Sequence, residues 1–79
     1  METVSVIGAG SWGTAVARHL VMNGHVVRLW SHNAEAARLI NERRENPRYL
    51  PGCFLPDGVT AFTDLSQALD GAAAAVLVV

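Results

Sequence analysis

The sequence predicts an α/β fold with a doubly wound parallel sheet, and three observations support this prediction. Short β-branched apolar runs alternate along the chain with longer amphipathic segments. The resulting order is strand, helix, strand, helix, strand, helix, strand, which is typical of parallel strands joined by right-handed crossovers. In addition, three glycines follow the first apolar run with the spacing Gly8-x-Gly10-x-x-Gly13, and they open the first helical segment.

The first strand is expected over Thr3–Ile7 and the first helix from Ser11 onward. The strand is a short β-branched run of the kind that is buried in parallel sheets. Asn23-Gly24 supplies a left-handed stop that ends the helix. The helix places small and aliphatic residues three and four positions apart on its inward face, namely Gly13, Val16, Ala17, Leu20 and Val21.

The second strand is expected over Val26–Trp30, followed by a helix over residues 34–44. Ser31-His32-Asn33 supplies the turn and the N-cap between them. Asn46-Pro47 is expected to break this helix, because the residue before a proline disfavours the helical conformation. The inward-facing residues are either Ala37 and Ile40, or Ala36, Leu39 and Ile40.

The rest of the chain is expected to contain an irregular connection, a strand, a short helix and a last strand. The connection is proline-rich and covers residues 48–58, and Val59–Phe62 is the third strand. Asp64 caps a helix of one to two turns that reaches Leu69. Asp70-Gly71 then turns the chain into an apolar strand that runs to residue 79.

The composition excludes several classes of protein. The 79 residues carry a net charge of -1 and no lysine, which offers no basic face for nucleic acid. The single cysteine, Cys53, cannot form an intrachain disulfide, and no histidine or cysteine pair has metal-ligand spacing, so a reduced cytoplasmic compartment is expected and no metal. The longest apolar stretch is well short of the roughly 20 residues that span a bilayer, so no transmembrane segment is expected.

The glycine loop predicts a dinucleotide-binding site. Gly8 permits a tight turn, Gly10 lets the backbone approach a pyrophosphate, and Gly13 lets the helix lie close to the strand. The free N–H groups of Ser11, Trp12 and Gly13 then face an anion at the positive end of the helix dipole. The alternative is a glycine-rich turn without a ligand.

Residues 1–79 are therefore expected to be the N-terminal half of a Rossmann-type dinucleotide-binding domain. The last strand runs to the final residue without a polar cap, which predicts that the domain continues beyond it.

The end of the second strand bears on the choice of cofactor. NAD sites of this kind usually place Asp or Glu there, to accept hydrogen bonds from the ribose hydroxyls, and FAD makes a similar demand. This chain has no carboxylate between Glu2 and Glu35, and Ser31 or His32 stands at the expected place. Nothing there repels a 2′-phosphate, which His32 and Arg38 could face. NADP, or use of both NADP and NAD, is therefore favoured, with a plain helix N-cap as the alternative.

Five segments together resemble the N-terminal domain of one enzyme family. They read VIGAGSWGTAVA, NGHVVRLW, NPRYLPG, LPDGV and TDLSQAL. Over residues 3–79 the combination is similar to bacterial-type NAD(P)-dependent sn-glycerol-3-phosphate dehydrogenases. The most specific parts are Ser11-Trp12-Gly13-Thr14-Ala15 and Asn46-x-x-Tyr49-Leu50-Pro51-Gly52. The chain departs from the family at Ala72-Ala73, where members often have Ala-Asp.

The resemblance implies roles for particular residues. Ser11 and Trp12 would contact the cofactor phosphates and flank the nicotinamide side, His32 would bind the adenosine phosphate, and Tyr49 would lie in a loop that closes over the cofactor. The Trp12 ring would point outward as a wall that excludes water from the hydride-transfer site. The alternative for Trp12 is a core anchor packed on neighbouring strands. The expected cofactor-binding residues are Gly8, Gly10, Ser11, Trp12, Gly13, Ser31, His32 and Tyr49.

The resemblance also implies an activity for the complete protein. It would be a cytoplasmic, homodimeric oxidoreductase that interconverts glycerol 3-phosphate and dihydroxyacetone phosphate with NAD(P)H for glycerophospholipid synthesis. Hydride would pass between nicotinamide C4 and substrate C2, a lysine would assist proton transfer, and a C-terminal helical domain would cover the substrate. Because this chain has no lysine, no catalytic residue is expected within it, and the chain alone is not expected to be active.

Two alternatives to this activity remain open. One is another NAD(P)-dependent reductase or dehydrogenase of the same superfamily, such as a ketopantoate or 3-hydroxyacyl-CoA enzyme, although Tyr49-Leu50-Pro51-Gly52 counts against it. The other is a module that senses NAD(P) without chemistry.

Overall fold

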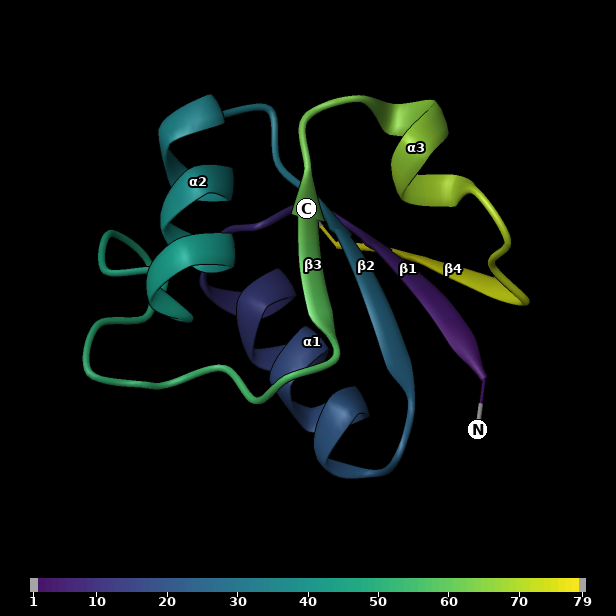
Figure 1. Ribbon diagram of the computed structural model, residues 1–79, viewed down its shortest axis with the longest axis horizontal. Helices are drawn as coiled ribbons and strands as arrows, with labels where there is room; N and C mark the ends of the chain where they lie inside the picture. Colours follow the sequence, from purple (N-terminus) through teal and green to yellow (C-terminus); the bar gives the residue numbers. More distant parts are fainter. Residues whose placement is uncertain (1, 79) are drawn as a thin grey trace.

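The computed structural model describes residues 2–78 as a four-stranded parallel sheet with three helices (Figure 1). The strands are β1 (Thr3–Ile7), β2 (Val26–Trp30), β3 (Val59–Phe62) and β4 (Ala74–Leu77). The helices are α1 (Ser11–Met22), α2 (Ala34–Arg43) and α3 (Leu65–Leu69). The strands lie in the order β3-β2-β1-β4, which confirms the predicted fold class and order of elements.

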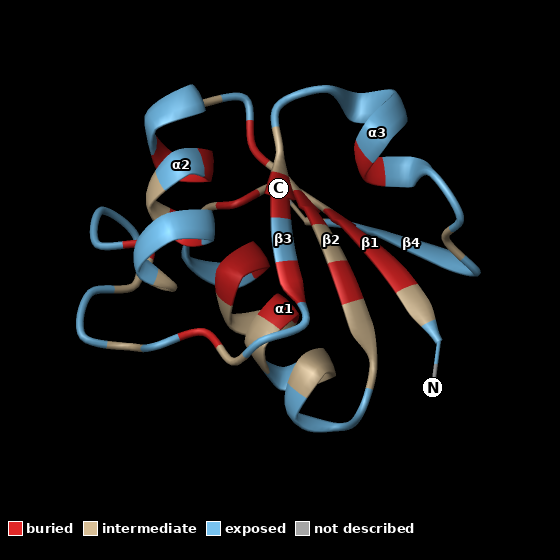
Figure 2. Cartoon of the chain, in the orientation of Figure 1, coloured by how far each residue is buried: buried red, intermediate tan, exposed pale blue. Residues whose placement is uncertain are grey.

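The helices form layers on both faces of the sheet. Figure 1 shows α1 and α2 on one face and α3 on the other. The core lies mainly between the sheet and the α1 and α2 layer, as the buried segments in Figure 2 indicate. Its largest fully buried apolar side chains are Leu29, Ile40, Val6, Val27 and Val59. The apolar spacing predicted the buried face of α1 apart from Thr14, and in α2 the buried residues combine the two predicted sets.

The carboxyl ends of three neighbouring strands meet at one edge of the sheet. β1 lies between β2 and β4, with Ile7 paired to Trp30 on one side and to Leu77 on the other. Gly8 N donates to Trp30 O at 3.1 Å, and Val78 N donates to Ile7 O at 3.0 Å. The chain leaves β1 toward β2 on one side and later returns to β4 on the other, which makes this edge the topological switch point where ligands bind in such sheets.

The end of α2 differs from the prediction. The helix does not run through residue 44 to a break at Asn46-Pro47; instead Arg44 takes the left-handed conformation, with φ 58°, and ends it. The Arg44 guanidinium donates to Pro56 O at 2.5 Å, and Leu55 N donates to Arg44 O at 2.6 Å. These contacts hold the connection between α2 and β3 against the helix end. Two residues beyond Arg44, Asn46 lies inward and is buried.

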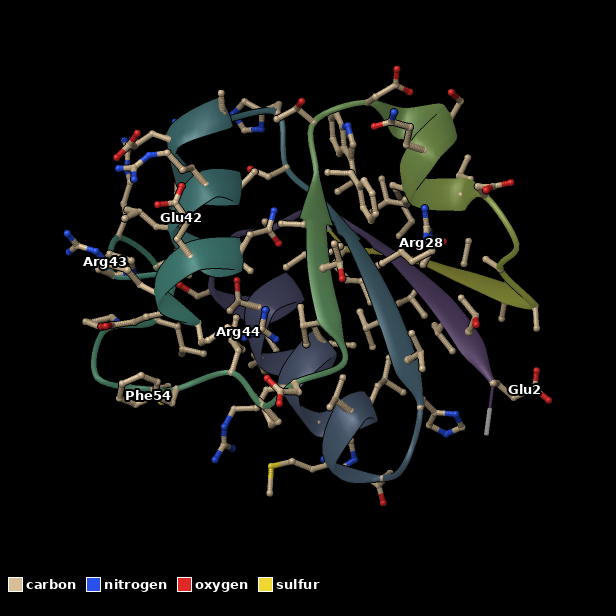
Figure 3. The ribbon with its side chains drawn as sticks, in the orientation of Figure 1. Glu2, Arg28, Glu42, Arg43, Arg44 and Phe54 are labelled. Carbon is tan, nitrogen blue, oxygen red and sulfur yellow. The ribbon has the colours of Figure 1, made fainter. Side chains whose placement is uncertain are left out.

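The last strand and the α3 face complete the described fold. Predicted to run to residue 79, β4 ends at Leu77; residue 78 is described and lies beyond the strand, and residue 79 lies outside the described residues. On the other face of the sheet, the Arg28 side chain reaches α3 and donates through Nη2 to Gln67 O at 2.7 Å (Figure 3). No helix within residues 2–78 is long and apolar enough to cross a membrane.

Candidate cofactor-binding site

The three glycines of the loop after β1 meet three different spatial demands. Gly8 has a φ of 124°, and a Cβ there would overlap the Val78 carbonyl oxygen. A Cβ on Gly13 would overlap the Gly8 carbonyl oxygen, so α1 can begin this close to β1 only with glycine. Gly10, in contrast, has no atom within 4 Å of the place that a Cβ would take. The backbone of Gly10 is therefore open to a ligand.

The N-terminus of α1 carries no group that satisfies its amides. Its N-cap is Gly10, with no side-chain capping bond and no acidic residue in the first turn. The first amide with an acceptor is that of Thr14, which donates to Gly10 O at 3.0 Å. Among residues 2–78, the amides of Ser11, Trp12 and Gly13 have no acceptor. The positive end of the helix dipole is thus open to an anion.

Two adjoining cavities lie at this edge of the sheet. The first, of about 330 Å³, lies over the ends of β1, β2 and β4, and the second, of about 310 Å³, lies over the first turn of α1. Gly10, Tyr49 and Val78 line both cavities. No acidic side chain among the described residues lines either cavity, so nothing there repels a phosphate group.

The eight expected cofactor-binding residues all line one or both of these cavities. Gly8, Gly10, Ser31, His32 and Tyr49 line the first, and Gly10, Ser11, Trp12, Gly13 and Tyr49 line the second.

Ser31 and His32 differ in what they present to the first cavity. Ser31 is only 3% exposed, and its Oγ donates to Asn33 O at 3.2 Å and accepts from Asn33 N at 3.1 Å. Asn33 caps α2 by accepting from Ala36 N at 3.0 Å, as predicted. His32 is exposed at the rim. The side chain that remains available to a ligand is therefore that of His32.

Trp12 lies on the surface and not in the core. Its side chain is 76% exposed in the first turn of α1, at the edge of the second cavity. The alternative in which Trp12 packs on neighbouring strands is therefore wrong.

Arg38 lines neither cavity, so the structure does not place it where the sequence expected it, facing a 2′-phosphate. It forms ion pairs with Glu35 at 2.5 Å and with Glu42 at 3.3 Å on the exposed face of α2 (Figure 3 labels Glu42). The hydrogen bond from Arg38 lowers the pKa of Glu35 below its usual value. Because residues three and four positions apart are neighbours on a helix, Arg38 pairs with acidic residues of α2 and does not extend to the cavities.

Asn46 is a site residue that sequence reasoning missed. Its side chain is 1% exposed, and Nδ2 donates to Ala9 O at 2.8 Å and to Thr14 Oγ1 at 2.9 Å. Three residues later, Tyr49 O accepts a hydrogen bond of 2.6 Å from Ser11 Oγ. The segment after α2 is therefore bonded to both sides of Gly10. Sequence reasoning identified Asn46 as part of the family-specific stretch Asn46-x-x-Tyr49-Leu50-Pro51-Gly52 and as a helix breaker, but it assigned Asn46 no contact with the glycine loop.

Comparison with known proteins gives one family. Residues 3–79 match the family described as NAD-dependent glycerol-3-phosphate dehydrogenase N-terminus. Glycerol-3-phosphate dehydrogenase [NAD(P)+] of Geobacillus thermodenitrificans is 57% identical over 79 residues, which are 100% of this chain and 23% of that protein. The protein of the same name from Halorhodospira halophila is 56% identical over 70 residues, or 89% of this chain and 21% of that protein.

Solved structures have the same arrangement. The crystal structure of glycerol-3-phosphate dehydrogenase from Coxiella burnetii superposes with a TM-score of 0.91 at 37% identity, over 99% of this chain and 24% of that chain. For glycerol-3-phosphate dehydrogenase from Saccharomyces cerevisiae the TM-score is 0.89 at 30% identity, over 99% of this chain and 26% of that chain. The chain thus spans about a quarter of the length of the proteins that it matches.

Proposed function

The chain belongs to the family of NAD-dependent glycerol-3-phosphate dehydrogenase N-termini, and we propose that it forms the cofactor-binding part of an enzyme that interconverts glycerol 3-phosphate and dihydroxyacetone phosphate with NAD(P)H. The observation that carries the proposal is the open space at Gly10, beside the uncapped N-terminus of α1 and between two adjoining cavities. This arrangement fits a dinucleotide, because a pyrophosphate needs close backbone approach and unpaired amides, with room on either side for the two nucleosides.

Each part of the site then has a task. The amides of the glycine loop and of the first turn of α1 hold the pyrophosphate. His32 contacts the adenosine phosphate at the rim of the first cavity, where the absence of carboxylates among the described residues favours NADP or both cofactors. Trp12 and Tyr49 form walls of the second cavity and keep water away from the nicotinamide side. When bound, the cofactor supplies or accepts the hydride.

The remainder of the activity belongs to parts of the protein beyond these residues. We propose that residues 1–79 are part of an NAD(P)-binding domain that continues, followed by a helical domain that holds the substrate. The lysine that assists proton transfer lies there, since this chain contains none. We further propose a homodimer in the cytoplasm that supplies the glycerol phosphate backbone of phospholipids.

The test measures, by the change in absorbance, whether the full-length protein oxidises NADPH when a substrate is added. We expect turnover with dihydroxyacetone phosphate and none with ketopantoate. Turnover with ketopantoate alone would change the assignment of the protein to a related reductase. Tight binding of NADPH without turnover of either substrate would instead indicate a sensing module.

A further inference from the structure

We infer that Asn46 is a positioning residue that sets the direction of the Gly10 N–H group, a role that rests on the proposed function. Asn46 follows α2 and is remote in sequence from the glycine loop, yet its buried side chain reaches that loop. Nδ2 donates to Ala9 O at 2.8 Å and to Thr14 Oγ1 at 2.9 Å, while Thr14 Oγ1 donates to Ala9 O at 3.3 Å. Two side chains therefore converge on the carbonyl that precedes Gly10.

This carbonyl controls where the Gly10 amide points. The peptide between Ala9 and Gly10 is planar and trans, so its C=O and N–H groups point in opposite directions. Ala9 O faces the buried side chains of Asn46 and Thr14, so Gly10 N–H faces the opposite side. Gly10 lines both cavities, and within residues 2–78 its amide has no acceptor. Asn46 thus aims a donor at the place that Gly10 leaves open for a pyrophosphate.

The polar atoms of Asn46 indicate a role in position and not only in stability. Ala9 O can only accept, so the amide nitrogen must face it, which fixes the orientation of the side chain. Oδ1 is then buried without a hydrogen-bond partner among the described residues. A buried acceptor without a partner is unfavourable for folding, and such exceptions call for an explanation beyond packing.

The same segment is attached on the other side of Gly10. Ser11 Oγ donates to Tyr49 O at 2.6 Å, and Tyr49 N donates to Asn46 O at 3.2 Å. A hydroxyl has one hydrogen, so this bond leaves the backbone N–H of Ser11 as the donor for an anion. The wall that Tyr49 forms and the amides of the glycine loop are therefore held as one unit.

The test is Asn46→Ala in the full-length protein, with binding of NADPH and NADH measured by calorimetry. The pyrophosphate is common to both nucleotides, so both dissociation constants should rise by the same factor, on the order of 10-fold. The kcat at saturating NADPH should change little, because the reacting atoms lie elsewhere. Thr14→Val should weaken both nucleotides in the same way, and the double variant should lose less than the product of the two effects.

Asn41→Ala is the matched control. Asn41 also bridges backbone through its amide, donating to Ala61 O at 3.0 Å and accepting from Ala61 N at 2.8 Å, but it ties α2 to β3. The Asn41→Ala substitution should lower the stability of the protein toward urea and leave the dissociation constants of both nucleotides unchanged.

Three results would overturn the role of Asn46: unchanged affinity in Asn46→Ala, a loss confined to NADPH, or an equal loss in Asn41→Ala. Wild-type protein that binds neither nucleotide would contradict the proposed function as well.

Discussion

Gly13 lies directly against Gly8, and a Cβ on Gly13 would overlap the Gly8 carbonyl oxygen. The backbone on both sides of this contact is fixed by β1 and α1, so neither can move away cheaply. Gly13→Ala should therefore lower the free energy of unfolding by about 1–3 kcal/mol or more. Urea denaturation of the full-length protein measures this, with Gly10→Ala as the control, since a Cβ at Gly10 meets no atom within 4 Å. Equal stability of the two variants would show that the helix start is not tightly packed.

The element order could be predicted because each strand and helix has a local sequence pattern that indicates it. Thr3–Ile7, Val26–Trp30 and Val59–Phe62 are β-branched runs between turn residues, and the structure has the strands at these bounds. The N-caps Asn33 and Asp64 could also be predicted, because Asn and Asp are favoured at the position before a helix. In the structure both side chains accept from amides two or three residues further on.

The contacts that sequence reasoning missed are of two kinds, local pairing and long-range packing. Arg38 pairs within its own helix, and Asn46 turns inward to a loop far back in the chain, which no local pattern indicates. Similarly, the Ser31 hydroxyl is engaged by Asn33 and leaves His32 at the rim. Spacing places residues on the same edge of the sheet, but only the fold determines which side chains are available there.

His32 is the residue at the rim of the first cavity that should discriminate between the two cofactors. Its contact with a 2′-phosphate would be solvent-exposed, so His32→Ala should weaken NADPH by no more than about 5-fold and NADH hardly at all. Arg38→Ala is the control, because its ion pairs with Glu35 and Glu42 keep it on the α2 surface. The measurement is the pair of dissociation constants for each variant. A larger effect of Arg38→Ala than of His32→Ala would contradict the geometry.

Ser31→Asp should shift the cofactor preference from NADPH toward NADH. An aspartate at this position can accept from Asn33 N as the serine does, and it places a negative charge at the wall of the first cavity. NADPH affinity should fall on the order of 10- to 100-fold, with NADH affected much less, because the charge repels the 2′-phosphate. Ser31→Asn, which lacks the charge, should leave the ratio of the two affinities unchanged. An unaltered ratio in Ser31→Asp would place the 2′-phosphate elsewhere.

Asp64 should make the stability of α3 depend on pH. Its pKa is lowered below the usual value first by the hydrogen bond from Ser66 Oγ, and also by the backbone amides of Gln67 and Ser66. A lowered pKa in the folded state contributes stability above the unfolded-state pKa, about 4, and that stability is lost as the pH falls through the folded value. Asp64→Ala should lower the melting temperature near neutral pH, and its difference from wild type should shrink on acidification. Asp57→Ala, at an exposed turn, should show neither effect.

The central claim is that the open backbone at Gly10 is where the cofactor pyrophosphate binds. Gly10→Val places a branched side chain in that space, where a Cβ has no atom of the described residues within 4 Å, and the φ of −74° at Gly10 suits valine. Calorimetric titration of the full-length Gly10→Val variant with NADPH, beside its circular dichroism spectrum, tests the claim most directly. We expect a wild-type spectrum and no measurable binding. A wild-type spectrum with unchanged affinity would mean that the glycine loop is only a turn and that the cofactor lies elsewhere.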